Sequence, residues 1–204
     1  MPSVVSLPVL CLASQSPRRK QILESLDIPF EIVRPTCEEI APTAGKIEKG
    51  IVENARAKAE SVLKGFKKSP AIVIGADTLV VLENKVMGKP ESSGDVRRML
   101  SDLSGQTHEV ITGLALVSNE FGCRESFAKS LVTFKRLSEE MIDQYANTRE
   151  PYDKAGSYAV QGLGAIFIEK ISGSYTNVMG FPLEHFLEEL SQLAPFPLAK
   201  WLPR

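Results

Sequence analysis

Two hydroxyl side chains and two guanidiniums lie close together near the start of the chain, where an apolar run ends in Leu12-Ala13-Ser14-Gln15-Ser16-Pro17-Arg18-Arg19. Residues 9–13 suit a buried strand. Ser16 followed by Pro17 is typical of a helix start, because serine caps free N–H groups and proline needs no partner in the first turn. Free N–H groups, the positive end of a helix dipole and arginine side chains all favour a bound anion. The stretch therefore predicts a phosphate site, with a capped helix and solvated arginines as the alternative.

A carboxylate and a hydroxyl interrupt the most apolar part of the chain. Asp77 and Thr78 stand between residues 71–75, which suit a strand buried on both faces, and the apolar residues 79–82. Charged residues are rarely buried without cause. We therefore expect Asp77 at a strand end, either as a functional acid or as a turn-capping side chain. A turn after this segment would place Lys89 just past a hairpin.

Further polar side chains fall on one predicted helix and in two predicted loops. Lys58 lies at the edge of the apolar stripe of an amphipathic helix expected over 47–66, where a solvated head group on an apolar stem is the alternative. The loops 34–45 and 150–161 contain Glu38, Glu39, Asp153, Lys154 and Gln161. Carboxylates and lysines of this kind suit a divalent cation and a phosphate chain.

Composition limits the classes of partner. The 204 residues carry a formal net charge of −1, which argues against general nucleic-acid binding because that needs a clearly basic face. The three cysteines have no CxxC spacing, and we expect reduced thiols in a cytoplasmic protein. The apolar opening follows no basic residue and is too short to span a bilayer. We therefore expect neither a signal peptide nor a membrane partner.

The apolar pattern alternates between the periods of helices and strands, which predicts an α/β fold. Strands are expected over 9–13, 29–33, 71–75, 106–117, 127–134, 165–169 and 174–178. Helices are expected over 18–26, 47–66, 95–103 and 182–193, with another capped by Ser138. Residues 194–204 are rich in proline and are expected to form a C-terminal tail.

Several standard chemistries lack their motifs. The chain has no GxxxxGK[ST] phosphate loop and no GxGxxG after a strand, so neither a P-loop nor a dinucleotide-binding fold is supported. Only two histidines are present, which excludes a histidine-rich metal centre, and no GxSxG elbow supports a serine triad. The remaining inventory of phosphate-binding cations and carboxylates suits metal-assisted phosphoanhydride hydrolysis.

Six ordered motifs resemble the Maf-like (septum-formation) nucleotide pyrophosphatases over residues 9–190. They are Ser14-x-Ser16-Pro17-Arg18-Arg19, Gly75-x-Asp77-Thr78-x-Val80, Gly88-Lys89-Pro90, Leu103-Ser104-Gly105-Gln106-Thr107-His108-Glu109-Val110, Asp153-Lys154-Ala155-Gly156-x-Tyr158-x-x-Gln161-Gly162 and Asn177-Val178-x-Gly180-x-Pro182-Leu183. The resemblance implies a two-lobed α/β domain, over 1–193, around a long mixed sheet similar to that of the inosine triphosphatases, with the site in the cleft between lobes. It also implies a homodimer that hydrolyses nucleoside triphosphates to the monophosphate and pyrophosphate with Mg²⁺ or Mn²⁺.

Carried onto this chain residue by residue, the resemblance implies a role for each candidate. Asp77 would accept the proton of the attacking water and would hold the metal with Glu38, for which Glu39 is the alternative. Lys58 and Lys89 would neutralise charge on the triphosphate and the departing pyrophosphate. The substrate-binding set would be Ser14, Ser16, Arg18, Arg19, Thr78, Asp153, Lys154 and Gln161.

The resemblance also narrows the substrate. Arg18, Thr78 and Gln161 match the subgroup that prefers dTTP and UTP, and the Gln161 amide can both donate to and accept from a base edge. CTP and modified pyrimidine nucleotides stay open, whereas Pro17 departs from the subgroup that prefers 7-methyl-GTP. Two other functions remain as alternatives: a non-enzymatic nucleotide sensor of septum formation, which an intact Asp77 argues against, and a purine pyrophosphatase acting on ITP or XTP.

Overall fold

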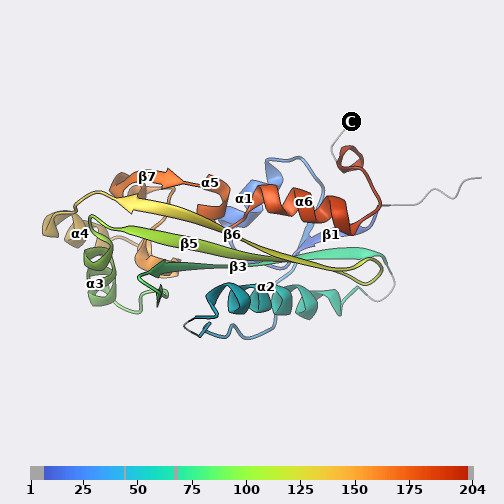
Figure 1. Ribbon diagram of the computed structural model, residues 1–204, viewed down its shortest axis with the longest axis horizontal. Coiled ribbons are helices and arrows are strands. Elements are labelled where there is room, and N and C mark those ends of the chain that lie inside the picture. Colours follow the sequence, from blue (N-terminus) through green and yellow to red (C-terminus); the bar gives the residue numbers. More distant parts are fainter. Residues whose placement is uncertain (1–6, 44, 67–68, 202–204) are drawn as a thin grey trace, which may run out of the picture.

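A seven-stranded mixed sheet forms the centre of the protein (Figure 1). The computed structural model describes residues 7–43, 45–66 and 69–201. The strands lie in the order β2-β1-β3-β5-β6-β7, and β4 pairs with β3 beside that path. Their bounds are β1 (Val9–Leu12), β2 (Glu31–Ile32), β3 (Ala71–Leu82), β4 (Lys85–Met87), β5 (Thr107–Ser118), β6 (Gly122–Phe134) and β7 (Ile168–Ser172).

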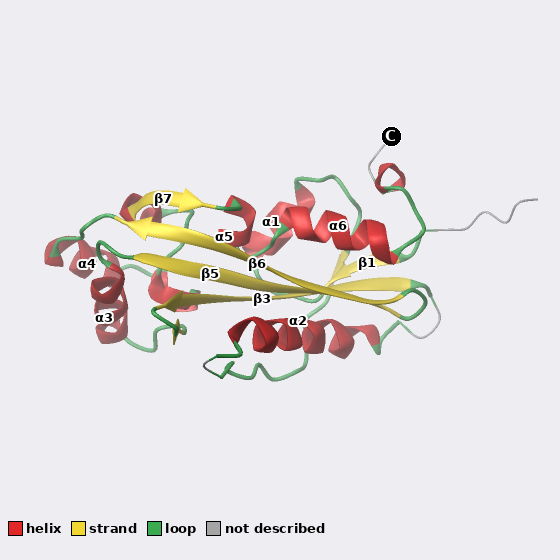
Figure 2. Ribbon diagram, in the orientation of Figure 1, coloured by secondary structure: helices red, strands yellow, loops and turns green. Residues whose placement is uncertain are grey.

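Helices cover both faces of the sheet and one of its ends. They are α1 (Pro17–Glu24), α2 (Ile47–Leu63), α3 (Ser93–Leu103), α4 (Glu139–Ala146), α5 (Tyr175–Val178) and α6 (Leu183–Leu193). Figure 2 shows α2 alone on one face, with α1, α5 and α6 on the other and α3 beside α4 at one end. Short 3-10 turns span Pro151–Asp153, Ala155–Ser157, Leu163–Phe167 and Leu198–Lys200.

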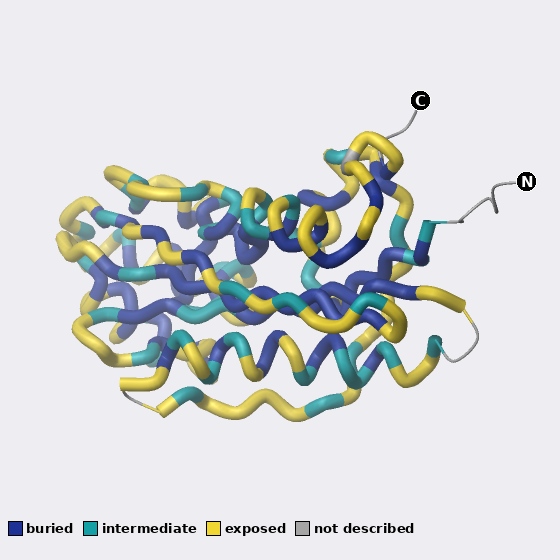
Figure 3. The backbone as a smooth tube through the Cα atoms, turned by 45° about the vertical axis from the view of Figure 1, so that its right-hand side comes forward, coloured by how far each residue is buried: buried dark blue, intermediate teal, exposed yellow. Residues whose placement is uncertain are grey.

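The long strands pass through two separately packed halves. Around β1, α1 and α6 the buried core includes Leu12, Phe181 and Phe186. Around α3 and α4 a second core includes Leu100 and Phe134. Figure 3 shows burial concentrated in the strands and in the helix faces turned toward them. The expected two-lobed α/β arrangement around a mixed sheet is confirmed.

One edge of β3 carries different neighbours along its length. β1 runs parallel to residues 71–74 of β3, and β4 runs antiparallel to residues 80–82 of β3. β5 pairs with the opposite edge of β3. Residues 75–79 therefore lie in a gap between the carboxyl end of β1 and the hairpin strand β4. Gaps of this kind at strand ends are where α/β sheets commonly bind ligands.

Glycines let α2 lie unusually close to the sheet. A Cβ at Gly75 would stand 1.9 Å from the carbonyl oxygen of Ala55, and one at Gly113 would stand 2.5 Å from that of Ile51. No side chain larger than hydrogen fits at either position without moving the helix. The two glycines therefore set the distance at which side chains of α2 meet β3.

The structure corrects three local predictions. The segment 165–169 is not one strand, because the 3-10 turn Leu163–Phe167 extends into it and β7 begins only at Ile168. Asp77 is not at a strand end, because the expected break at Gly75 is absent and β3 continues to Leu82. The segment 174–178 is not a strand: Ser174 accepts a hydrogen bond from the Asn177 N–H and caps a one-turn helix. A serine cap outweighed β-propensity at this point.

The segment expected to form a tail contributes to the first core. Ala194, Phe196 and Trp201 are buried there, and the Phe196 ring meets the Trp201 ring edge to face with centroids 6.4 Å apart. Nothing in these contacts distinguishes a separate unit, so the boundary after residue 193 stays a prediction.

Candidate active site

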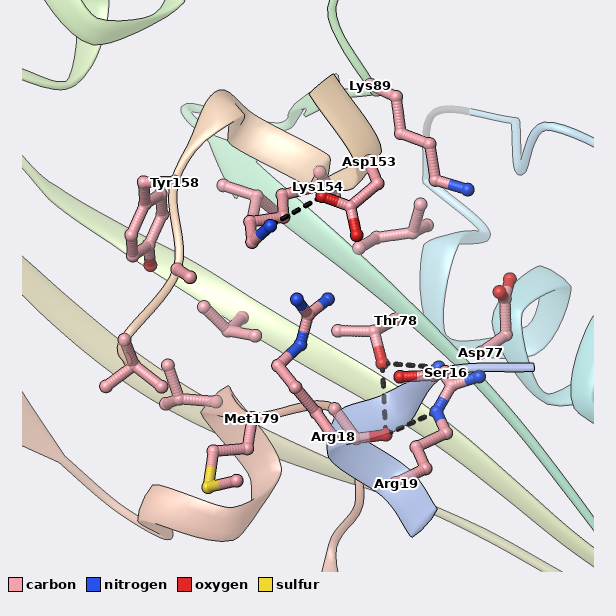
Figure 4. Close-up of a pocket in the computed structure, with 18 of the residues that line it drawn as sticks. Ser16, Arg18, Arg19, Asp77, Thr78, Lys89, Asp153, Lys154, Tyr158 and Met179 are labelled. Atoms are coloured by element: carbon pink, nitrogen blue, oxygen red, sulfur yellow. Dashed lines mark hydrogen bonds and ion pairs between the residues drawn. The ribbon is translucent and has the colours of Figure 1, made fainter. Parts of the chain in front are cut away.

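A pocket of about 330 Å³ opens at the gap along β3, between the two halves (Figure 4). Nine of the predicted residues line it, and they come from five parts of the chain. They are Ser16, Arg18, Arg19, Lys58, Asp77, Thr78, Lys89, Asp153 and Lys154. Ser14 lines an adjoining hollow. The fold thus brings together nearly all the side chains that the sequence singled out.

Asp77 shares an ammonium group with Glu39. The Lys58 Nζ donates to Asp77 Oδ1 at 2.7 Å and lies 2.7 Å from Glu39 Oε1. Asn54, one helical turn before Lys58 on α2, donates from Nδ2 to Asp77 Oδ2 at 3.0 Å. Since a buried carboxylate is costly without partners, these contacts satisfy both oxygens of Asp77 and fix the orientation of its side chain.

Thr78 points to the opposite face of the sheet from Asp77, as alternation along a strand requires. Its hydroxyl accepts a hydrogen bond from Arg19 Nη2 at 3.0 Å and lies 3.1 Å from the hydroxyl of Thr112. Arg19 also donates from Nε to the Gly180 carbonyl at 2.8 Å. Burial is the main cause that lowers the pKa of Arg19. Arg19 therefore ties α1, β3 and the turn before α6 together beneath the pocket.

The start of α1 leaves hydrogen-bonding groups available. Ser16 occupies the N-cap position and Pro17 follows it, as predicted, but the Ser16 hydroxyl makes no capping hydrogen bond. Instead the Ser16 N–H donates to the Ser14 hydroxyl at 3.1 Å. The Ser16 hydroxyl and the Arg18 guanidinium both line the pocket, which is the arrangement that phosphate binding requires.

Of the two adjacent acids in the loop before α2, Glu39 is the one at the pocket. Burial raises the pKa of Glu39, but the hydrogen bond and charge of Lys58, with Lys89 and Arg19 behind them, outweigh burial and leave the pKa lowered. Glu38 is exposed and does not line the pocket. The structure therefore brings Glu39, the alternative candidate from the sequence, to the pocket rather than Glu38.

The loop of the second half contributes a charged pair. Lys154 donates to the Glu150 carbonyl at 2.6 Å and to the neighbouring Asp153 carboxylate. Partial burial raises the pKa of Asp153, but the Lys154 hydrogen bond and charge, followed by the charge of Arg18, leave it lowered. The Asp153 carboxylate is thus anionic opposite the start of α1.

The end of the pocket away from Asp77 is apolar. Tyr158, Val160 and Met179 line it, and such a surface suits a flat base and a sugar rather than phosphate. Gln161, the predicted base-reading residue, is half-buried next to Val160 and does not line the pocket. The structure does not bring Gln161 to the other candidates.

A buried histidine holds the apolar wall from behind. The Tyr158 hydroxyl lies 2.7 Å from His108 Nε2, and His108 packs edge to face against Phe134. Burial lowers the pKa of His108 to about 4, so its ring is neutral near pH 7. His108 is therefore a packing residue.

The carboxylates at Asp77 and Glu39 supply part of what a site for a hard divalent cation needs. Within the described chain no three His, Cys, Asp or Glu residues cluster as a metal site. However, Asp77 and Glu39 converge on one ammonium at 2.7 Å each, which shows that positive charge is stabilised between them. Two carboxylates completed by substrate phosphates and water are the usual ligands of Mg²⁺.

Asn54 is a side chain in contact with Asp77 that the sequence analysis missed. Its spacing of four residues from Lys58 on an amphipathic helix was the available signal, since such residues share one face. No local sequence pattern could have indicated the Gly180 carbonyl or the Met179 side chain. They reach the pocket because the segment between α5 and α6 packs next to α1 and β3.

No helix in the described part of the chain is long and apolar enough to cross a membrane.

Comparisons with known proteins give one family. The model of the Maf-like protein family matches residues 9–193. A dTTP/UTP pyrophosphatase of Bacillus cytotoxicus is 44% identical over 181 residues, which are 89% of this chain and 93% of that protein. A dTTP/UTP pyrophosphatase of Syntrophus aciditrophicus is 42% identical over 185 residues, 90% of this chain and 89% of that protein. A HAM1 protein structure from Coxiella burnetii is 17% identical with a TM-score of 0.45, covering 92% of this chain and 96% of that one.

Proposed function

The chain belongs to the Maf-like protein family, and we propose that it hydrolyses dTTP and UTP to the nucleoside monophosphate and pyrophosphate, as a house-cleaning enzyme of nucleotide pools. The single observation that carries this proposal is the placement of the Asp77 carboxylate, fixed by Lys58 and Asn54, in a pocket lined by five cationic side chains. Two relatives at 42–44% identity carry that activity in their names.

Asp77 is the proton acceptor in this proposal. A carboxylate has about four lone-pair sites, so Asp77 can accept from an attacking water while it holds Lys58 and Asn54. The water attacks the α-phosphorus, its proton passes to Asp77, and the bond to the β-phosphate oxygen breaks. Lys58 counters the negative charge around Asp77, and Lys89 at the rim counters the charge that develops on the pyrophosphate.

Phosphate binding falls to the start of α1. Arg18 and the Ser16 hydroxyl offer donors to the phosphate chain, and Arg19 positions Thr78 and Ser14 beneath it. Lys154 adds a cation on the facing side of the pocket, where Asp153 orients it. Hydrogen bonds from charged arginine and lysine donors to phosphate oxygens are stronger than hydrogen bonds between neutral groups.

A divalent cation, Mg²⁺ or Mn²⁺, would be held by Asp77 and Glu39 and would supply Lewis-acid stabilisation of phosphate charge. Glu38 stays the alternative partner. For the base, the apolar wall at Tyr158 and Met179 would hold the pyrimidine ring, and Gln161 would reach its edge only after a movement of the loop that carries it.

The test is pyrophosphate release from dTTP, UTP, CTP, 7-methyl-GTP, ITP and dATP, with Mg²⁺ or Mn²⁺ present. We expect dTTP and UTP to be the preferred substrates. Asp77→Asn should lower kcat by about a hundredfold or more, as removal of a general base does. The control is Asp102→Asn, because Asp102 is an exposed acid on α3 outside the pocket.

The same panel separates the alternatives. Nucleotide binding without turnover in the wild-type protein would contradict the hydrolase and favour a nucleotide sensor of septum formation. Preference for ITP over the pyrimidine nucleotides would favour a purine pyrophosphatase. The homodimer and the cytoplasmic location, which rest on the family resemblance and the cysteines alone, are tested by light scattering of the purified protein and by fractionation of cells.

A further inference from the structure

A second hollow of about 410 Å³ continues from the active-site pocket past the start of α1. The two share the residues at which the phosphate chain is expected to lie: Ser16, Arg18, Arg19, Glu39, Lys58, Lys89 and Asp153. The second hollow is therefore an extension of the same groove. Arg34 and Ser14 line the extension but not the pocket itself.

Arg34 is placed beside α1 by backbone pairing. β2 lies parallel to β1, and the Val33 N–H donates to the Leu12 carbonyl at 3.1 Å, one hydrogen bond beyond the paired residues. The next residue, Arg34, therefore stands next to the loop that leads from β1 to α1. Strand pairing in the sheet therefore sets the position of Arg34.

The charges of the extension are unbalanced. Its lining holds five cationic side chains against the two carboxylates of Glu39 and Asp153. Among the described residues Arg18, Arg34 and Lys89 form no ion pair, whereas Lys58 is paired twice. Converging cations that lack protein partners raise the local potential and attract an anion.

The two ends of the groove differ in polarity. The pocket end has the apolar wall of Tyr158, Val160 and Met179, while the apolar lining of the extension is small: Ala13, Pro17, Pro35 and Cys37. A nucleoside triphosphate matches the polarity of the groove in only one orientation. In that orientation the nucleoside would lie in the pocket, the α-phosphate at Asp77 and the outer phosphates in the extension.

We propose that Arg34 binds the terminal phosphate of the substrate, and afterwards the released pyrophosphate, and so selects triphosphates over shorter nucleotides. This proposal rests on the proposed function. Arg34 takes no part in bond cleavage: its guanidinium forms charge-assisted hydrogen bonds to the terminal phosphate, which carries a charge of about −2.

The test compares Arg34→Gln and Arg34→Lys with Arg149→Gln, an exposed arginine that lines neither hollow. For each variant the KM for UTP and the inhibition constants of inorganic pyrophosphate and UMP are measured. Direct binding of pyrophosphate and of UMP is followed by calorimetry, which does not depend on turnover.

For Arg34→Gln we expect both the KM for UTP and the pyrophosphate dissociation constant to rise about fivefold to tenfold, with UMP binding unchanged. Arg34→Lys should recover part of the loss, because lysine keeps the charge but not the planar fork. Arg149→Gln should match the wild type.

Two results would overturn the proposal: unchanged pyrophosphate binding in Arg34→Gln, or UMP binding weakened as much as pyrophosphate binding. An absence of UTP hydrolysis in the wild type would instead overturn the proposed function. Calorimetry keeps the two failures distinct, since it reports on pyrophosphate in either case.

Discussion

The Lys58 ammonium on α2 lies 2.7 Å from the Asp77 carboxylate on β3, and both side chains are buried. They are 19 residues apart in the chain. The packing of α2 on the sheet brings them together, and Gly75, two residues before Asp77, permits that packing. The centre of the site therefore depends on backbone contact as much as on charge.

We predict that Lys58→Met lowers the free energy of unfolding by about 3 kcal/mol at pH 7, because it leaves the buried Asp77 carboxylate without a counter-ion. Urea unfolding measures the change. Lys64→Met, at the exposed end of the same helix, should shift it by less than about 0.5 kcal/mol. Equal small losses in both variants would show that the pair does not stabilise the fold.

Replacing the close-approach glycine tests the geometry of α2. Gly75→Ala should cost at least about 2 kcal/mol of unfolding free energy, because the new Cβ must displace the Ala55 carbonyl. Activity should fall with it, since α2 carries Lys58. The matched control is Gly94→Ala in the first turn of α3, where the nearest neighbour of a Cβ is 3.6 Å away; there alanine should be neutral or stabilising. A stable, fully active Gly75→Ala protein would contradict the role of the glycine.

The two loop acids are predicted to behave differently. Glu39→Gln should raise the Mg²⁺ concentration needed for half-maximal activity by about tenfold or more, because Glu39 faces Asp77 across the Lys58 ammonium. Glu38→Gln should leave it unchanged, since Glu38 is exposed and away from the pocket. Electron paramagnetic resonance of bound Mn²⁺ gives a readout independent of turnover. The reverse order of effects would make Glu38 the ligand.

His108 makes stability depend on pH. Its pKa falls from the usual 6.5 to about 4 through burial, so between these values the unfolded chain takes up a proton that the folded protein does not. Stability is therefore lost as the pH falls from about 6.5 to about 4, by about 3 kcal/mol from this residue.

His108→Gln should abolish that contribution while keeping a hydrogen-bond partner for Tyr158. Unfolding free energies of both proteins at pH 7 and pH 4.5 measure it, because the other titrating groups cancel in the comparison. The difference between wild type and variant should narrow at pH 4.5. Parallel pH profiles would show that His108 is not the group responsible.

The sequence by itself determined most of the element order, the helix start at Ser16 and Pro17, and the family. These features depend on residues close together in the sequence. Examples are the apolar run before Ser16 and Pro17, the N-cap Ser138, whose hydroxyl accepts from the Met141 N–H, and motifs that follow one another in a fixed order. Local signals of this kind survive because each depends on neighbours within a few residues.

Only the tertiary structure decided how those residues meet. Asp77 proved to be inside a continuous strand because β5 pairs along its whole length, a long-range contact that no local break signal reports. The approach of α2 brought Asn54 to Asp77, and the contact with Lys58 brought Glu39 rather than Glu38 to the pocket. The fold also left Gln161 outside the pocket and set Arg34 beside α1. Side-chain direction and strand pairing fixed these outcomes, and both are properties of the packed sheet rather than of any single segment.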